Sequence, residues 1–182
     1  MKIKSIATCL LGLLFACSSP DTPAEGQRSL FRTTQPSHLY FKNIRSNSYQ
    51  METQTGTRVD LYQLRSSADT KGRPMLYPVI ADNWMEDEAY IFLEPNDFTE
   101  GFSDTLRVAW RTQRDSGRYE LAPHNREGQF RFAQQLYEGL RAGYRFHIRT
   151  ADGDYAPLFQ NNRDRRNFLT TLRDYNKLIE KE

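Results

Sequence analysis

The hydrophobic pattern of this chain changes its period along the sequence, and this change limits the fold more than any other feature. In the middle of the chain apolar and polar residues alternate, as at Leu106, Val108 and Trp110, which is the period of a half-buried strand. Near the end, the apolar residues lie three and four positions apart, which is the spacing of one helical face. That stripe consists of Phe168, Leu172, Tyr175 and Ile179, widened by Leu169 and Leu178.

Most of the expected strands come before the expected helices. The strands are expected at residues 39–49, 58–64, 75–81, 89–93, 106–111, 119–121 and 144–148, with a hairpin turn at Thr55-Gly56 between the first two. One helix is expected over residues 130–140 and is ended by Gly143, and the last helix begins at Asn161 or Asn162. This order predicts an α+β single domain, with a mostly antiparallel β-sheet of about six to eight strands and two helices in the C-terminal third.

The first residues have the composition of an export signal. Lys2 and Lys4 supply positive charge, and residues 6–16 are almost entirely apolar. This stretch is too short to cross a bilayer, which needs about 20 apolar residues, but it suits the hydrophobic region of a signal peptide. The alternatives are a buried core helix and a plain signal peptide cleaved near Ala16.

The end of this stretch, Leu14-Phe15-Ala16-Cys17, resembles the lipobox of bacterial lipoproteins. In that family an aliphatic residue lies three positions before the cysteine and a small residue lies directly before it. The resemblance implies that Cys17 becomes the N-terminus and carries a diacylglyceryl group, often with an added acyl chain such as palmitate. Two or more buried chains give a stable membrane anchor. Ser18, which replaces the aspartate of inner-membrane lipoproteins, implies the outer membrane if the host is Gram-negative.

Together with the composition, this resemblance predicts three segments of the chain. Residues 1–16 are the signal peptide. Residues 17–35 are the lipidated N-terminus and a flexible tether, because serine, threonine, proline and charged residues dominate there. Residues 36–182 are enough for a single domain of ordinary size.

Removal of the signal peptide changes the charge and the cysteine content. Loss of Lys2 and Lys4 reduces the 25 basic residues to 23, which equals the 23 acidic ones. Nucleic acid is therefore not expected as a partner, since it requires a basic footprint. Cys9 leaves with the signal and Cys17 is lipidated, so no thiol remains for a disulfide, a metal site or nucleophilic catalysis.

Arginine is concentrated in the second half of the chain. The residues concerned are Arg107, Arg111, Arg114, Arg118, Arg126, Arg131, Arg141, Arg145 and Arg149. One hypothesis is that they pair with carboxylates across a sheet face. The other is that Arg107, Arg111, Arg145 and Arg149 bind an anionic partner, such as lipid A phosphates, an acidic glycan or an acidic patch of an envelope protein.

An acidic stretch without lysine or arginine lies between Arg73 and Arg107. Its residues Glu94, Asp97, Glu100 and Asp104 could supply oxygen ligands for calcium from a loop. The alternative is a solvated acidic loop, and no cofactor is expected. The similar run Asp152-Gly153-Asp154 is better explained as a turn between two strands.

No catalytic motif is recognisable. His38, His124 and His147 are too far apart in sequence to form a helical ligand pair, and each is interpreted as structural or solvated. The sequence thus predicts a non-enzymatic, membrane-tethered binding or assembly module of the cell envelope. The competing hypothesis is an envelope hydrolase whose site is assembled from scattered residues such as His124, Asp97 and Glu100.

Overall fold

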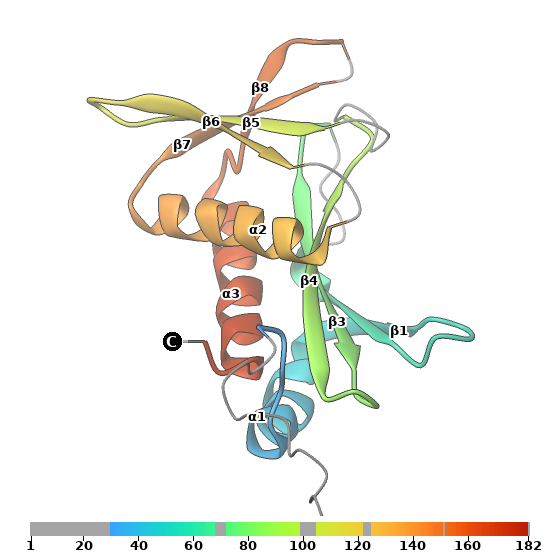
Figure 1. The fold of residues 1–182 in the computed structure, drawn as a ribbon. Helices are drawn as coiled ribbons and strands as arrows, with labels where there is room; N and C mark the ends of the chain where they lie inside the picture. Colours follow the sequence, from blue (N-terminus) through green and yellow to red (C-terminus); the bar gives the residue numbers. More distant parts are fainter. Residues whose placement is uncertain (1–29, 68–71, 99–104, 122–124, 151, 182) are drawn as a thin grey trace, which may run out of the picture.

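Two antiparallel sheets of four strands each form the frame of the protein (Figure 1). A computed structural model describes residues 30–67, 72–98, 105–121, 125–150 and 152–181. The first sheet has the order β1 (Tyr49–Thr53), β2 (Asp60–Leu64), β3 (Leu76–Asn83) and β4 (Glu88–Pro95). The second has the order β6 (Ser116–Leu121), β5 (Leu106–Arg111), β7 (Arg145–Arg149) and β8 (Tyr155–Leu158).

The first sheet packs one face against α3 (Asn162–Leu178). The helix begins where the sequence predicts, because the Asn161 side chain accepts a hydrogen bond from the Asp164 N–H at 2.8 Å. Its apolar stripe is buried, with Phe168 and Tyr175 each at most 1% exposed. The hydroxyl of Tyr175 also donates a hydrogen bond to the Ala89 carbonyl of β4. This contact fixes the helix against the edge of the sheet.

The second sheet lies above α2 (Arg126–Arg141), as Figure 1 shows. The N-cap of this helix is Asn125, and Gly143 follows its end with a φ of +81°, as expected for a glycine after a helix. Gly139 allows a close approach to the sheet, since an added Cβ would lie 2.6 Å from the Phe146 ring. The helix also contacts β4 and α3, so it joins the two sheets.

The segment before β1 is helical, and the strand predicted at residues 39–49 is wrong. The chain forms α1 (Gln35–Tyr40), a π-helical turn η1 (Phe41–Arg45) and the 3-10 turn η2 (Ser46–Ser48). Thr34 and Ser37 form a capping box, and the proline between them occupies the first helical turn, where it is tolerated. This local start signal outweighs the alternation of apolar residues. A further 3-10 turn, η3 (Arg65–Ser67), follows β2.

The packed structure begins before residue 36. Phe31 lies against Tyr90 and Phe130, with ring centroids 5.3 and 5.9 Å away. The N–H of Thr33 donates to the Asp87 carbonyl, and the N–H of Ala89 donates to the Phe31 carbonyl. These backbone hydrogen bonds cover the outer edge of β4, which would otherwise expose unpaired groups.

The predicted fold class is confirmed: the protein is a single α+β domain with antiparallel sheets, and α2 and α3 lie in its C-terminal third. One hydrophobic core contains side chains from both sheets, from the turn η1 and from the helices α2 and α3. Its residues lie between Phe41 and Ile179, so a chain of residues 18–182 keeps the whole core. Among the described residues, no helix has the length and apolar character needed to cross a membrane.

Candidate functional site

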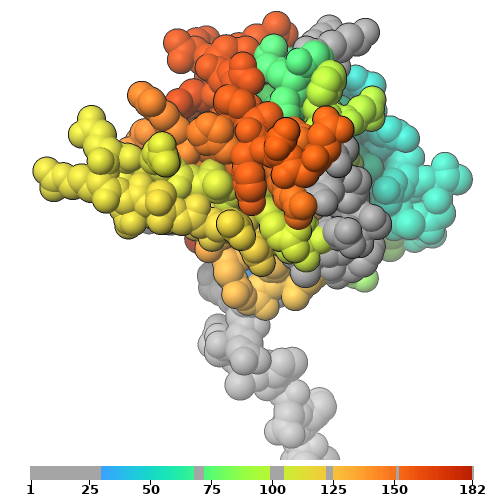
Figure 2. All heavy atoms as spheres, turned by 90° about the horizontal axis from the view of Figure 1, so that it is seen from above, coloured from blue at the N-terminus to red at the C-terminus, as the bar shows by residue number. Residues whose placement is uncertain are grey.

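The second sheet has one buried face and one face that carries arginines. Val108 and Ile148 are paired and completely buried toward α2, so the alternate positions point outward. We call the outward side the arginine face; its strand residues are Arg107, Ala109, Arg111, Ser116, Arg118, Glu120, Arg145, His147, Arg149, Tyr155 and Pro157. Figure 2 views the molecule from above, where β5 and β6 lie beside the β7–β8 hairpin.

A hollow lies at the centre of the arginine face. Ala109 is paired with Arg118 on one side and with His147 on the other. Because alanine is short, the longer basic side chains around it border a depression of about 540 Å³. Arg111, two residues further along β5, also lines it. The hollow can therefore place several N–H donors around one bound anion.

Intramolecular ion pairs neutralise only part of this face. Glu120, the only acidic residue among the strand positions of the face, lies 3.6 Å from Arg107 and 3.9 Å from Arg118. Within the described residues, Arg111 and Arg145 form no ion pair. The hypothesis of carboxylate pairing thus accounts for Arg107 but leaves Arg111 and Arg145 unexplained.

Aromatic packing supports this face from below. Trp110 stacks on Tyr144 with a centroid distance of 5.0 Å and an interplanar angle of 26°. Gly117, opposite Trp110, leaves room for the indole, since an added Cβ would lie 2.6 Å from the ring. The strands that carry the arginines are therefore fixed by packed rings on the inner side of the sheet.

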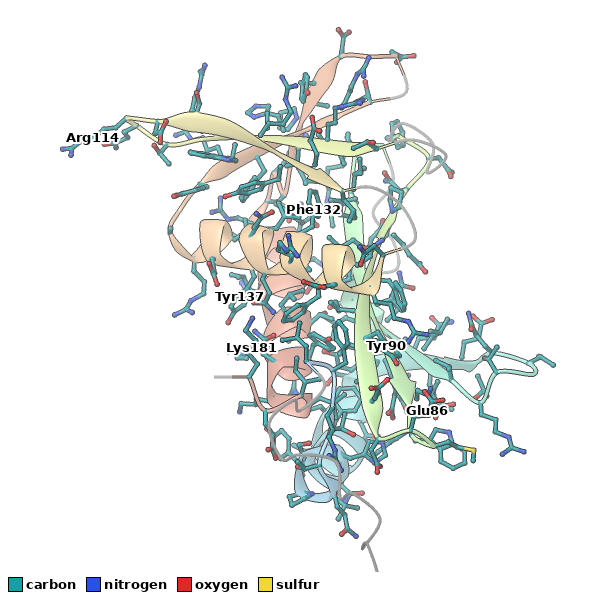
Figure 3. The ribbon with its side chains drawn as sticks, in the orientation of Figure 1. Glu86, Tyr90, Arg114, Phe132, Tyr137 and Lys181 are labelled. Atoms are coloured by element: carbon teal, nitrogen blue, oxygen red, sulfur yellow. The ribbon has the colours of Figure 1, made fainter. Side chains whose placement is uncertain are left out.

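The four arginines predicted as ligand-binding residues lie on one face of one sheet, as the strand alternation indicates. Of these four, Arg111 lines the hollow among the described residues; the sequence interpretation did not include its basic neighbours there, Arg118 and His147, although the same alternation places them on this face. The other arginines lie elsewhere; Arg114, for example, is at the tip of the β5–β6 hairpin (Figure 3).

Two other predicted sites are only partly covered by the described residues. Glu94 is near the end of β4 and Asp97 lies in the following turn, while Glu100 and Asp104 of the expected calcium site lie outside the described residues. His124 and Glu100 of the hydrolase hypothesis lie outside them too. In the part of the chain that is described, no three His, Cys, Asp or Glu residues form a group suited to a metal.

Cys17 and the residues before it also lie outside the described part of the chain. The turn predicted at residues 152–154 is confirmed: Gly153 has a φ of +87°, and the Thr150 N–H donates to the Asp154 carbonyl at 2.8 Å.

The sequence interpretation missed a polar cluster beneath α1. Nε2 of His38 lies 2.8 Å from Oδ2 of the fully buried Asp82, and Nζ of Lys42 lies 3.3 Å from the same atom. Lys42 also donates to Asp60 and Tyr62, and Oδ1 of Asp82 has no hydrogen-bond partner among the described residues.

The chemistry of this cluster favours anchoring over catalysis. Burial alone would lower the pKa of Lys42, but its hydrogen bonds to Tyr62 and Asp60 and the nearby Asp82 carboxylate raise the pKa above its usual value. Lys42 is therefore held as an ammonium ion and is no general base near neutral pH. The cluster binds the helical N-terminal segment to β2 and β3.

Comparison of the chain with protein-family models, with curated proteins and with solved structures gave no match.

Proposed function

We propose that this protein is a membrane-anchored binding module of the cell envelope, whose arginine face binds an acidic glycan. The observation that carries the proposal is the group of basic residues around Ala109, of which Arg111 has no intramolecular ion pair within the described residues. The planar guanidinium group suits carboxylates and phosphates, because two of its N–H groups can donate in parallel to two oxygens.

The composition of the face favours a charged polymer over a protein partner. Binding energy at protein interfaces is concentrated in buried aromatic and apolar anchors. Tyr155, at 40% exposure, is the only large hydrophobic residue on the strands of the arginine face that is strongly exposed. A polyanion needs no such anchor, because charge supplies most of the attraction and makes it dependent on salt.

The membrane anchor in this proposal is the lipid on Cys17, which the lipobox resemblance implies. A segment of the length between Cys17 and Leu30 reaches at most about 45 Å when extended. Phe31 and Thr33 lie beside the half of β4 remote from the second sheet, so the arginine face is turned away from the place where the described chain begins (Figure 1). This arrangement leaves the face open to a ligand while the protein is anchored.

The proposal is tested by measuring the binding of residues 18–182 to polygalacturonate, with neutral dextran as a comparison. We expect saturable binding to polygalacturonate and no binding to dextran. Added salt should weaken the binding to polygalacturonate. The double variant Arg111→Ser and Arg145→Ser should lower the affinity about tenfold, since two charge-assisted contacts are lost. Arg131→Ala removes a charge outside the face, where Arg131 pairs with Glu127, and should have little effect.

Equal affinity of the double variant and the wild type would contradict the proposal. Tighter binding to an acidic polypeptide such as polyglutamate than to polygalacturonate at equal charge density would also contradict it, in favour of a protein partner.

A further inference from the structure

The first sheet contains a second and larger hollow, which we call the sheet groove. It lies on the face of β2, β3 and β4 opposite α3, and its volume is about 940 Å³. The turn between β1 and β2 and the first turn of α2 form its walls. Figure 3 labels Tyr90, on β4 below α2, and Glu86, in the turn between β3 and β4; both line the groove. This volume is in the range of small-molecule binding sites.

The floor of the sheet groove is apolar because of the register of three strands. Leu61, Ala81 and Tyr90 lie in one row across β2, β3 and β4. In the next row, Val79 lies beside Phe92. Successive side chains of a strand point to opposite faces of the sheet. The residues next to these in sequence therefore point toward α3, and these side chains lie on the opposite face. A ligand with an apolar body can therefore be buried against them.

The charged groups around the groove are mainly acidic. Glu94 and Glu86 line it, and Glu86 accepts a hydrogen bond from the Asn83 amide. Partial burial of the carboxyl group, together with the nearby Glu52 carboxylate, raises the pKa of Glu94 above its usual value. Within the described residues, neither Glu94 nor Glu52 forms an ion pair.

Among the described residues that line the groove, the one basic residue is already engaged. The guanidinium group of Arg126 lies 4.0 Å from the centre of the Tyr90 ring, and its NH1 donates to the Tyr90 hydroxyl at 2.7 Å. Arg126 is thus fixed as part of the wall formed by α2. Glu94, by contrast, offers a carboxylate that forms no ion pair with a described cation.

We propose that the sheet groove binds a small cationic amphiphile, with its apolar body on Val79, Ala81 and Phe92 and its ammonium group at Glu94. The ammonium group would relieve the repulsion between Glu94 and Glu52, and the apolar floor would be removed from water. This site prefers the opposite charge to the arginine face and lies on the other sheet. The two proposals are therefore independent.

The test uses residues 18–182 and three probes with the same alkyl chain: octylamine, octanol and octanoate. Binding is followed by NMR through the methyl signals of Leu61, Val79 and Ala81. We expect octylamine to shift these signals saturably, with an affinity about fivefold higher than that of octanol, as one partly exposed ion pair can supply. Octanoate should bind more weakly than octanol.

Two variants separate charge from apolar contact. Glu94→Gln should reduce the affinity for octylamine to that for octanol and leave octanol unchanged. Glu120→Gln, on the second sheet, should change neither. Equal affinities for the three probes, tighter binding of octanoate, or shifts confined to methyl groups outside the groove would overturn the proposal.

Discussion

Arg111 on β5 lies directly opposite Arg145 on β7, and within the described residues neither forms an ion pair. Like charges directly opposite in a sheet are destabilising. The pair is therefore unfavourable for the isolated fold, although the buried side of the same strands is well packed, with Phe146 only 2% exposed. A bound anion would reverse the sign of this interaction, which links the stability of the sheet to the proposed function.

Replacement of one of these arginines should stabilise the unliganded protein. Arg145→Thr removes the repulsion and places a β-branched residue in a strand, so we expect the free energy of unfolding to rise by about 0.2–1 kcal/mol at low salt. The gain should shrink as salt is added, because both side chains are exposed. Urea denaturation at two salt concentrations measures both effects.

The matched control is Arg131→Ala, which removes the same charge but breaks the Arg131–Glu127 pair on α2. It should give no salt-dependent gain in stability. If Arg145→Thr lowered the stability at low salt, the two arginines would not repel each other in the folded protein.

The same glycine-to-alanine change should have opposite effects at two positions of α2. Gly139→Ala forces a Cβ to within 2.6 Å of the Phe146 ring, so we expect a loss of about 1–3 kcal/mol. At Gly128 the nearest atom to an added Cβ is 3.5 Å away, and the better helix propensity of alanine should add up to about 1 kcal/mol. Chemical denaturation of both variants checks the signs, and two losses of equal size would argue against the close approach of α2 to β7.

Alkaline pH should unfold the protein through its buried tyrosines. Burial raises the pKa of Tyr49 and of Tyr175 above the usual tyrosine value, with the Asp174 carboxylate adding to the effect at Tyr49. A group with a raised pKa in the folded state stabilises the fold below its unfolded pKa, and this contribution is lost as the pH rises. The free energy of unfolding should thus fall above a pH of about 10.

Tyr49→Phe isolates one of these groups. The variant should have a shallower decline above pH 10, by up to about 1.4 kcal/mol per pH unit, because one delayed ionisation is absent. Urea titrations over that range measure the slope. An unchanged slope would show that Tyr49 ionises equally in the folded and unfolded states.

Cys17→Ser tests the proposed anchor. The variant cannot accept a diacylglyceryl group on this residue, so it should accumulate as an unlipidated and poorly processed precursor. Metabolic labelling with a fatty acid, followed by membrane fractionation, measures lipidation and retention together. Normal membrane retention of a cleaved Cys17→Ser protein would contradict the lipoprotein hypothesis.

Local signals predicted the elements of this fold where they agreed with the packing. The N-cap Asn161 and the stripe through Phe168 and Tyr175 predicted α3, since both signals act within one element. At residues 39–49 the apolar alternation was misleading, because the capping box of Thr34 and Ser37 started a helix instead.

The arginine face and the sheet groove also differ in how far the sequence could predict them. Alternation along β5 and β7 was enough to suggest that Arg111 and Arg145 share a face, although their direct pairing depends on strand order. The sheet groove depends on the register of Leu61, Ala81 and Tyr90 across three strands. No pattern within a single segment contains that register, so the groove could not be predicted from the sequence.

The central claim is that the arginine face is the surface that binds an anionic glycan. An NMR titration of residues 18–182 with short galacturonate oligomers tests it most directly, with the backbone signals of all residues followed together. We expect the largest shifts to cluster at Ala109, Arg111, Arg118 and His147, and the signals of the first sheet to be unaffected. Saturable binding with its largest shifts away from these residues, or no binding at low salt, would contradict it.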